Sequence, residues 1–163
     1  MSLSVDEYLA GLLTREEING FLSEVELMGD AVYKIGEGSL SQLFQSGIGA
    51  KSAQVILGTL DAAGKLEDKD YQKQFFEGIT KKLKEIPILN LELAFEPTRE
   101  LLAKIKDTWS EYLGKPIAID YKVDTKIMGG ARLAFMGKYF DFTLDAKWPE
   151  IWAVVREKLR LKT

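Results

Sequence analysis

Three aspartates in the last third of the chain, Asp120, Asp124 and Asp141, are the residues whose type could support catalysis. If they met at one end of a small sheet, their carboxylates could hold a divalent cation or act as an acid and base pair. The sequence contains no histidine and no cysteine, so the usual general base and the thiolate nucleophile are both missing. A carboxylate-dependent enzyme stays one hypothesis. Hydrogen bonds in turns and solvated strand faces are the simpler interpretation.

The segment from Gly47 to Ser52 ends in Lys-Ser and so looks like a phosphate-binding loop. That pattern requires glycine at two positions that are Gln45 and Ala50 here, and no strand-like alternation comes before it. We therefore expect no nucleotide site in this segment, and we expect the chain to work without a cofactor.

Charge and hydropathy limit the possible partners. The 163 residues carry a formal net charge of -3, with both signs interspersed, which predicts no binding to nucleic acid and no direct attraction to an anionic membrane. The sequence shows no apolar run as long as a membrane span and no signal-peptide pattern at its N-terminus. We expect a cytoplasmic protein whose contact with a membrane is only indirect.

Residues 1–86 have the pattern of a helical bundle. A first helix is predicted from Val5 to Leu13, and the spacing of Thr14 and Glu17 is that of a capping box, which predicts the start of a second helix. Pro87 closes the helical half, so the domain boundary is placed between residues 86 and 87. The apolar stripes that predict the later helices are Ile18, Phe21, Leu22, Val25, Met28 and Val32, then Leu40, Leu43 and Phe44 beyond Gly36 and Gly38, then Ala53, Ile56, Leu57 and Leu60, and finally Tyr71, Phe75, Phe76, Ile79 and Leu83.

After Pro87 the apolar period changes from that of a helix to that of a strand. Residues 89–95 and 117–123 alternate, and the segment from Thr98 to Leu113 between them has helical spacing and ends at Gly114. Two short strands and a helix follow, which gives the order β-α-β-β-β-α. The sequence therefore predicts an α+β chain, in which a helical bundle of residues 1–86 is followed by a small α/β domain of residues 87–163.

The stretch from Val123 to Leu144 organises the second domain. Gly129 and Gly130 stand next to strand-like alternation, which predicts a positive φ or a close backbone approach that a Cβ would obstruct. Gly137-Lys138 predicts a tight hairpin that leads into the last strand. We expect this stretch to form a small antiparallel unit.

A closing helix is predicted to begin at Asp145, whose carboxylate suits an N-cap, with Pro149 in its first turn. Cationic side chains gather near its end, where the helix dipole favours them. The apolar stripe is Trp148, Ile151, Trp152, Val155 and Leu159, and the cations are Arg156, Lys158, Arg160 and Lys162.

The second domain resembles the C-terminal part of the delta subunit of F-type ATP synthases, which is called oligomycin-sensitivity-conferring protein in mitochondria. That family carries Val-Asp, an aliphatic residue, Gly-Gly and a later aspartate near its last short strand. The matching residues are Val123, Asp124, Ile127, Gly129, Gly130 and Asp141. The order of strand, helix, Gly114-Lys115 and strand also matches, and Phe142-Thr143 stands where the family usually has Gly-Ser.

The resemblance implies a structural role rather than catalysis. A delta subunit ties the catalytic head of the rotary synthase to its peripheral stalk and resists the torque of rotation. Its helical domain receives the N-terminal helix of an alpha subunit, and its C-terminal part meets the ends of the b subunits of the stalk. The complex would place the chain peripherally on the inner face of the cell membrane. The apolar positions suited to the partner helix are Tyr8, Leu12, Phe75 and Ile79.

Two further classes of protein stay open. The E-type peripheral-stalk subunit of vacuolar and archaeal ATPases also ends in a small α/β head, but it begins with a long coiled-coil helix, which the glycines between Gly29 and Gly49 disfavour. The second domain could also be a small-ligand-binding or nucleic-acid-binding module. It lacks the clustered basic residues and surface aromatic residues that the nucleic-acid function needs.

Overall fold

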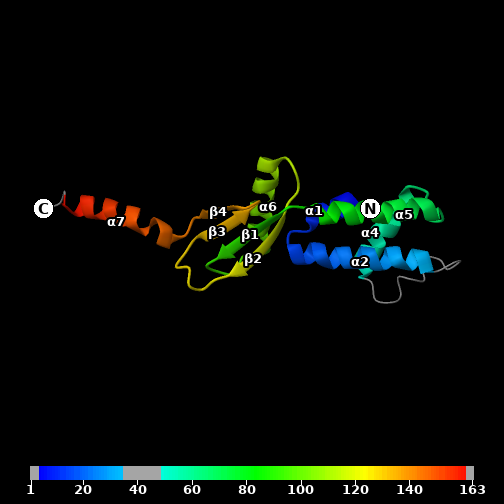
Figure 1. The fold of residues 1–163 in the computed structure, drawn as a ribbon, viewed down its shortest axis with the longest axis horizontal. Coiled ribbons are helices and arrows are strands. Elements are labelled where there is room, and N and C mark those ends of the chain that lie inside the picture. The colour runs from blue at the N-terminus through cyan, green and yellow to red at the C-terminus, as the bar shows by residue number, and fades with distance from the viewer. Residues whose placement is uncertain (1–3, 35–48, 161–163) are drawn as a thin grey trace. The chain divides into compact units, whose positions relative to one another are not determined.

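The computed structural model describes residues 4–34 and 49–160 (Figure 1). The chain divides into two compact units, Met1–Ile86 and Pro87–Thr163, and each is described by itself. The first unit contains α1 (Val5–Gly11), α2 (Arg15–Lys34), α4 (Ala50–Ala62) and α5 (Lys69–Lys84). The second contains β1 (Ile88–Leu93), α6 (Arg99–Leu113), β2 (Ala118–Val123), β3 (Ala131–Phe135), β4 (Lys138–Asp141) and α7 (Leu144–Arg160). The helix predicted around Leu40, Leu43 and Phe44, and the glycines before it, lie outside the described residues.

The predicted fold class is confirmed. Among the described residues, helices make up the regular structure of the first unit, and a four-stranded sheet with two helices makes up that of the second. The order β-α-β-β-β-α is also confirmed, because the change of apolar period after Pro87 coincides with the change from helix to strand.

Side-chain caps fix the starts of α1 and α2 in the first unit. Ser4 and Glu7 form a capping box at α1, which ends at Gly11, before the predicted end at Leu13. At α2, Thr14 Oγ1 accepts a hydrogen bond from the N–H of Glu17 (3.2 Å), and the Glu17 carboxylate accepts one from the N–H of Thr14 (3.3 Å). The predicted capping box is confirmed, and it satisfies amides that have no partner within the helix.

The core of the first unit forms where α2 packs along α5 and where α1 meets α4. Val25 of α2 and Ile56 of α4 are completely buried. On α5 the buried side chains are Gln72, Phe76, Ile79 and Leu83. The prediction of Tyr71 for this stripe was wrong, since Tyr71 is 37% exposed and Gln72 lies inside. The Gln72 amide donates a hydrogen bond to the carbonyl of Leu66, so its burial leaves that donor satisfied.

The sheet of the second unit has the strand order β2-β1-β3-β4. β1 runs parallel to β2 and antiparallel to β3, and β3 runs antiparallel to β4. A parallel pair needs a crossover, and α6 supplies it between β1 and β2. Leu89 and Leu91 of β1 are at most 2% exposed. The ring of Trp109 on α6 lies 5.7 Å from that of Phe135 on β3, so α6 covers the apolar face of the sheet.

The hairpin between β3 and β4 turns one residue earlier than predicted. Phe135 pairs with Lys138, so the loop consists of Met136 and Gly137 rather than Gly137 and Lys138. Both loop residues have positive φ, 47° for Met136 and 78° for Gly137. Two consecutive positive φ values match the right-handed twist of the flanking strands, which explains why the chain accepts a methionine in this conformation.

The last helix also starts earlier than predicted. α7 begins at Leu144, and Thr143 rather than Asp145 is its cap, since Thr143 Oγ1 accepts a hydrogen bond from the N–H of Ala146 (3.3 Å). Pro149 therefore lies inside the helix instead of in its first turn. A proline has no N–H, so the carbonyl of Asp145 loses its partner within the helix.

No helix of the described segments combines the length and apolar character that crossing a bilayer would require.

Candidate functional site

The Val-Asp to Gly-Gly motif begins at the last residue of β2, Val123, and continues along the loop to β3, and this loop meets the junction between β4 and α7. The N–H of Leu144 donates to the carbonyl of Gly129 (2.9 Å), and the N–H of Phe142 donates to the carbonyl of Ala131 (2.8 Å). We call this region, residues 124–130 together with residues 141–144, the glycine corner. It is the place where α7 is attached to the sheet.

Asp124 and Ile127 shape the loop. The N–H of Asp124 donates to the carbonyl of Leu93 (2.9 Å), and Asp124 Oδ1 accepts a hydrogen bond from the N–H of Lys126 (3.0 Å). An aspartate that bonds the amide two residues later stabilises a turn. Ile127 is 4% exposed and anchors the loop in the core, whereas Val123 at the end of β2 is 38% exposed.

The two glycines meet different obstacles. Gly130 has a φ of 90°, and a Cβ at this position would overlap the carbonyl oxygen of Phe142. A Cβ at Gly129 would lie 2.8 Å from Cδ1 of Leu144, the flexible end of a side chain. Positive φ and backbone approach thus both act at Gly130, while at Gly129 only a side chain has to move.

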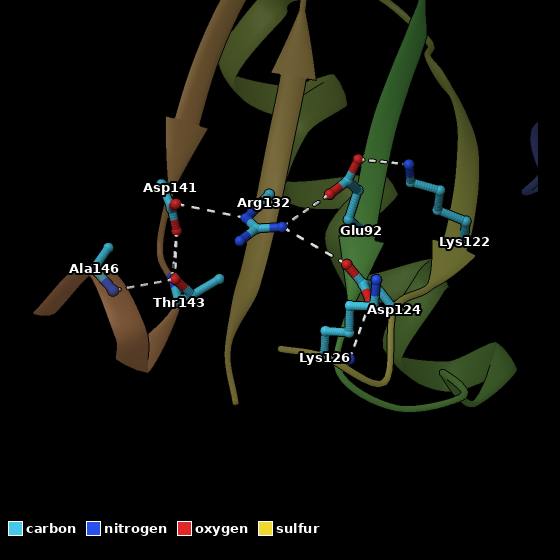
Figure 2. Close-up of polar contacts among 8 residues, drawn as sticks. All are labelled: Glu92, Lys122, Asp124, Lys126, Arg132, Asp141, Thr143 and Ala146. Carbon is cyan, nitrogen blue, oxygen red and sulfur yellow. Dashed lines mark hydrogen bonds and ion pairs between the residues drawn. The ribbon is translucent and has the colours of Figure 1, made fainter. Parts of the chain in front are cut away.

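Asp141 connects β4 to the start of α7 (Figure 2). Its Oδ1 accepts hydrogen bonds from the N–H of Thr143 (2.9 Å) and from Thr143 Oγ1 (2.6 Å). Thr143 is completely buried. Its hydroxyl donates to Asp141 and accepts from the N–H of Ala146, so both its capacities are used. The family that the second domain resembles usually has serine at this position, and Thr143 supplies the same hydroxyl group.

Arg132 on β3 joins the glycine corner to the rest of the sheet. Its Nη1 lies 3.4 Å from Glu92 Oε2 and 3.7 Å from Asp124 Oδ2, and its Nε lies 3.5 Å from Asp141 Oδ2 (Figure 2). Lys122 Nζ lies 2.7 Å from the other oxygen of Glu92. The buried Nε makes no hydrogen bond, so Asp141 attracts it as an ion pair without hydrogen-bond alignment. The sequence reasoning missed this arginine.

The polar contacts keep these groups charged. The hydrogen bond from Lys122 lowers the pKa of Glu92, and the bond and charge of Arg132 add to the effect. The hydroxyl and backbone N–H of Thr143 lower the pKa of Asp141. The same bond to Glu92 raises the pKa of Lys122. These hydrogen bonds therefore favour the ionised forms of Glu92, Asp141 and Lys122.

Of the three aspartates that could have formed a catalytic pair, two come together. Asp124 and Asp141 both face Arg132, whereas Asp120 lies on β2 opposite Asn90. Within residues 4–34 and 49–160, no cluster of three or more acidic, histidine or cysteine side chains is arranged to hold a metal ion. The arrangement can position a helix, because its polar groups are used to hold one another and the first turn of α7.

The four apolar residues predicted to receive a partner helix differ in exposure. Leu12 is 8% exposed and Ile79 is 5% exposed, so both belong to the core of the first unit. Tyr8 is half-buried and lies edge-on to a ring of α2 at 4.8 Å, and Phe75 is half-buried beside Tyr71 at 6.4 Å. Only Tyr8 and Phe75 of the four keep accessible surface, and their role in binding stays a prediction.

A further apolar surface runs from β4 to α7. The rings of Phe140 and Phe142 stack at 6.3 Å, and those of Trp148 and Trp152 stack at 6.2 Å. The four rings, which we call the aromatic surface, are between 39% and 51% exposed. Lys147 Nζ of α7 lies 5.9 Å from the Phe142 ring. The sequence predicted the stripe of α7, but strand alternation alone could not show that the two phenylalanines remain exposed.

Residues 14–151 match a family model described as the ATP synthase delta (OSCP) subunit. The chain belongs to this family. The match begins at the predicted cap of α2 and ends within α7, so the likeness first noticed in the second domain also includes the helical unit. No curated protein matches the chain.

Delta (OSCP) subunits are structural components of the peripheral stalk of F-type ATP synthase, and they bind its alpha subunit and the stalk. This chain is accordingly a stalk subunit and not an enzyme. No finding favours the E-type stalk subunit or the small-ligand-binding module. In this delta (OSCP) subunit the glycine corner attaches α7 to the sheet. The aromatic surface is an exposed apolar area of the second unit.

Proposed function

We propose that the two units of this delta (OSCP) subunit are separate domains that hold different partners. The unit Met1–Ile86 takes up the amphipathic N-terminal helix of an alpha subunit, and the unit Pro87–Thr163 takes up the ends of the b subunits. The observation that carries this division is the aromatic surface, whose four rings keep between 39% and 51% of their area accessible. Large exposed apolar patches mark interaction sites in soluble proteins.

The exposed residues of α7 suit contact with another helix. Beyond Trp148 and Trp152, the same stripe includes Ile151 (39% exposed) and Leu159 (61%). Side chains that repeat at helical spacing can lie against the apolar face of an amphipathic helix. Tryptophan often dominates binding energy at such interfaces, because it brings a large rigid apolar area.

Within residues 4–34 and 49–86, the first unit shows fewer exposed large apolar side chains. Tyr8 and Phe75 are half-buried, and Leu27 on α2 and Tyr71 on α5 are 59% and 37% exposed. These side chains are the candidates for contact with a helix that adds to the bundle without opening its core. Since the core already contains Leu12 and Ile79, we assign the direct contacts to Tyr8 and Phe75.

Joining two modest contacts through one chain raises the effective concentration of each partner for the other. A linker between the catalytic head and the stalk needs this property, because both ends must stay bound under load. The net charge is only -3, so binding should depend mainly on apolar burial and respond weakly to salt. We place the subunit on the cytoplasmic side, where the complex holds it near the membrane.

The test uses the full chain and two synthetic peptides, one from the N-terminus of an alpha subunit and one from the C-terminus of a b subunit, in calorimetric titrations. We expect Trp152→Ala to weaken the b peptide about 30-fold, as loss of a central tryptophan does at other interfaces. Phe75→Ala should weaken only the alpha peptide. If one substitution weakened the binding of both peptides, the assignment of one partner to each unit would be wrong. Failure of the full chain to bind either peptide would reject the proposal as a whole.

A further inference from the structure

One row of charged side chains crosses all four strands of the sheet. In the strand register Lys122 lies opposite Glu92, Glu92 lies opposite Arg132, and Arg132 lies opposite Asp141. The order of strands is β2-β1-β3-β4, so the signs alternate from positive at β2 to negative at β4. Opposite charges in direct cross-strand pairs stabilise the alignment of neighbouring strands.

The row does not stop at the edge of the sheet. Asp141 uses Oδ2 to face Arg132 and Oδ1 to accept both hydrogen bonds from Thr143. Thr143 in turn caps α7 through the N–H of Ala146. A continuous line of polar contacts therefore runs from the sheet into the first turn of α7 (Figure 2).

Arg132 also contacts the loop between β2 and β3, which holds the start of α7 by a second route. Its Nη1 lies 3.7 Å from Asp124 Oδ2, and Asp124 begins the loop whose Gly129 carbonyl accepts the N–H of Leu144. A guanidinium is a planar fork that can serve several carboxylates at once, whereas an ammonium is a single point charge. Arg132 is thus in contact with both segments that hold the start of α7.

We propose that Arg132 is the positioning residue of α7: through Asp141 and Asp124 it fixes the direction in which the helix leaves the sheet. The sheet itself depends on the apolar layer between β1, β3 and α6, which the arginine does not enter. Its loss should consequently change the position of α7 more than the stability of the sheet. The consequence for stalk binding rests on the proposed function, because α7 carries half of the aromatic surface.

The test measures the direction of α7 without any partner. The chain contains no cysteine, so two labels can be introduced at exposed positions, Asp107→Cys on α6 and Glu157→Cys on α7. Double electron–electron resonance then gives the distribution of label distances. We expect one narrow peak for the otherwise unchanged chain and loss of this peak in Arg132→Met, with a broad distribution in its place.

Two further variants distinguish a specific effect on the position of α7 from a general loss of order in the second unit. Lys122→Met removes the opposite end of the same row, where Glu92 still has Arg132, and it should keep the narrow peak. Arg132→Lys should restore the peak only in part, since one ammonium cannot reach Asp124 and Asp141 together as the fork does. Should Arg132→Met fold poorly, Asp141→Asn tests the same contact and should also broaden the peak.

An unchanged narrow peak in Arg132→Met would overturn the inference, and so would equal broadening in Lys122→Met. The b peptide supplies a second readout, for which Arg132→Met should weaken binding while Lys122→Met should not. If the unchanged chain failed to bind that peptide, the proposed function would fail, and the distance measurement would still decide the role of Arg132.

Discussion

The two helices of the second unit are both amphipathic, but the apolar face of α6 packs on the sheet while that of α7 is exposed. Both α6 and α7 carry tryptophan and leucine on an apolar stripe, and a threonine caps each of them. α6 buries Leu102 and sets Trp109 against Phe135 of the sheet. α7 exposes its stripe, including about half of Trp152. An amphipathic pattern therefore predicts which face of a helix is apolar, but not whether the same chain or another one covers it.

The largest expected effect is a difference in stability between the two stripes. Leu102→Ala on α6 should lower the free energy of unfolding by about 2–5 kcal/mol, because it leaves a cavity in the core. Trp152→Ala on α7 should change it by no more than about 0.5 kcal/mol, as expected of a surface substitution. Urea unfolding of the full chain measures both values. Equal losses would show that α7 is covered within the isolated chain.

The glycine corner distinguishes the start of α7 from that of α6, and Gly130→Val should disturb it. We expect a loss of about 1–3 kcal/mol, towards the upper end, because the residue must adopt positive φ and overlaps a carbonyl oxygen. Gly137→Val is the matched control, since its φ is 78° and a Cβ there would meet no atom within 4 Å. Gly129→Val should cost less than Gly130→Val. Unchanged melting temperatures for both glycines of the corner would remove its special role.

The two threonine caps allow a direct comparison of the helix starts. Thr98 at α6 is exposed, and its hydroxyl accepts a hydrogen bond from the N–H of Leu101 (3.2 Å). Thr143 is buried and serves both Asp141 and Ala146. Loss of a threonine cap costs about 0.5–2 kcal/mol, so we expect Thr143→Val near the upper limit and Thr98→Val near the lower. The reverse order in thermal unfolding would mean that the contact with Asp141 does not support α7.

The smallest effect should be a dependence of stability on pH. Asp141 and Glu92 have folded pKa values below their ordinary values of 3.8 and 4.5. Groups of this kind stabilise the fold above the unfolded pKa, and the contribution disappears as pH falls through the folded pKa. When the pH is lowered below about 4, the melting temperature should therefore decrease. Asp141→Asn should flatten this acid limb, and an unchanged limb would show that Asp141 contributes nothing to it.

Local signals predicted much of the fold. The start of α6 at Thr98, its end at Gly114 and the capping box of Thr14 and Glu17 each depend on a few neighbouring residues, which lie together in the sequence. The change of apolar period at Pro87 gave the order of elements for the same reason. Long-range register is different, because it depends on which strands become neighbours.

Arg132 shows where the sequence stops being sufficient. Lys122, Glu92 and Asp141 all stand at polar positions of their strands, yet their charges meet only in the observed register. A search for opposite charges at polar strand positions would have pointed to Arg132 as a candidate. It could not have chosen among partners without knowing that β3 lies between β1 and β4.

The cap of α7 was missed for a related reason. Asp145 and Thr143 are both acceptable caps, and Pro149 favoured the later start because proline is common near the beginning of helices. Asp141 decides for Thr143, since it binds both the hydroxyl and the N–H of that residue. Gln72 rather than Tyr71 lies in the core of the first unit, because its amide can donate a hydrogen bond to the carbonyl of Leu66. No local sequence pattern indicates this contact.

Pro149 makes α7 easier to bend near its start. The first turn is clamped at Leu144 and Ala146, and the helix lacks a hydrogen bond at the carbonyl of Asp145, where it bends more easily. The first turn of α7 is therefore fixed, and any bending of the helix is expected near Pro149, before Trp152. In a stalk subunit under load, we expect elastic deflection of α7 to concentrate at this point rather than in the contacts of the glycine corner.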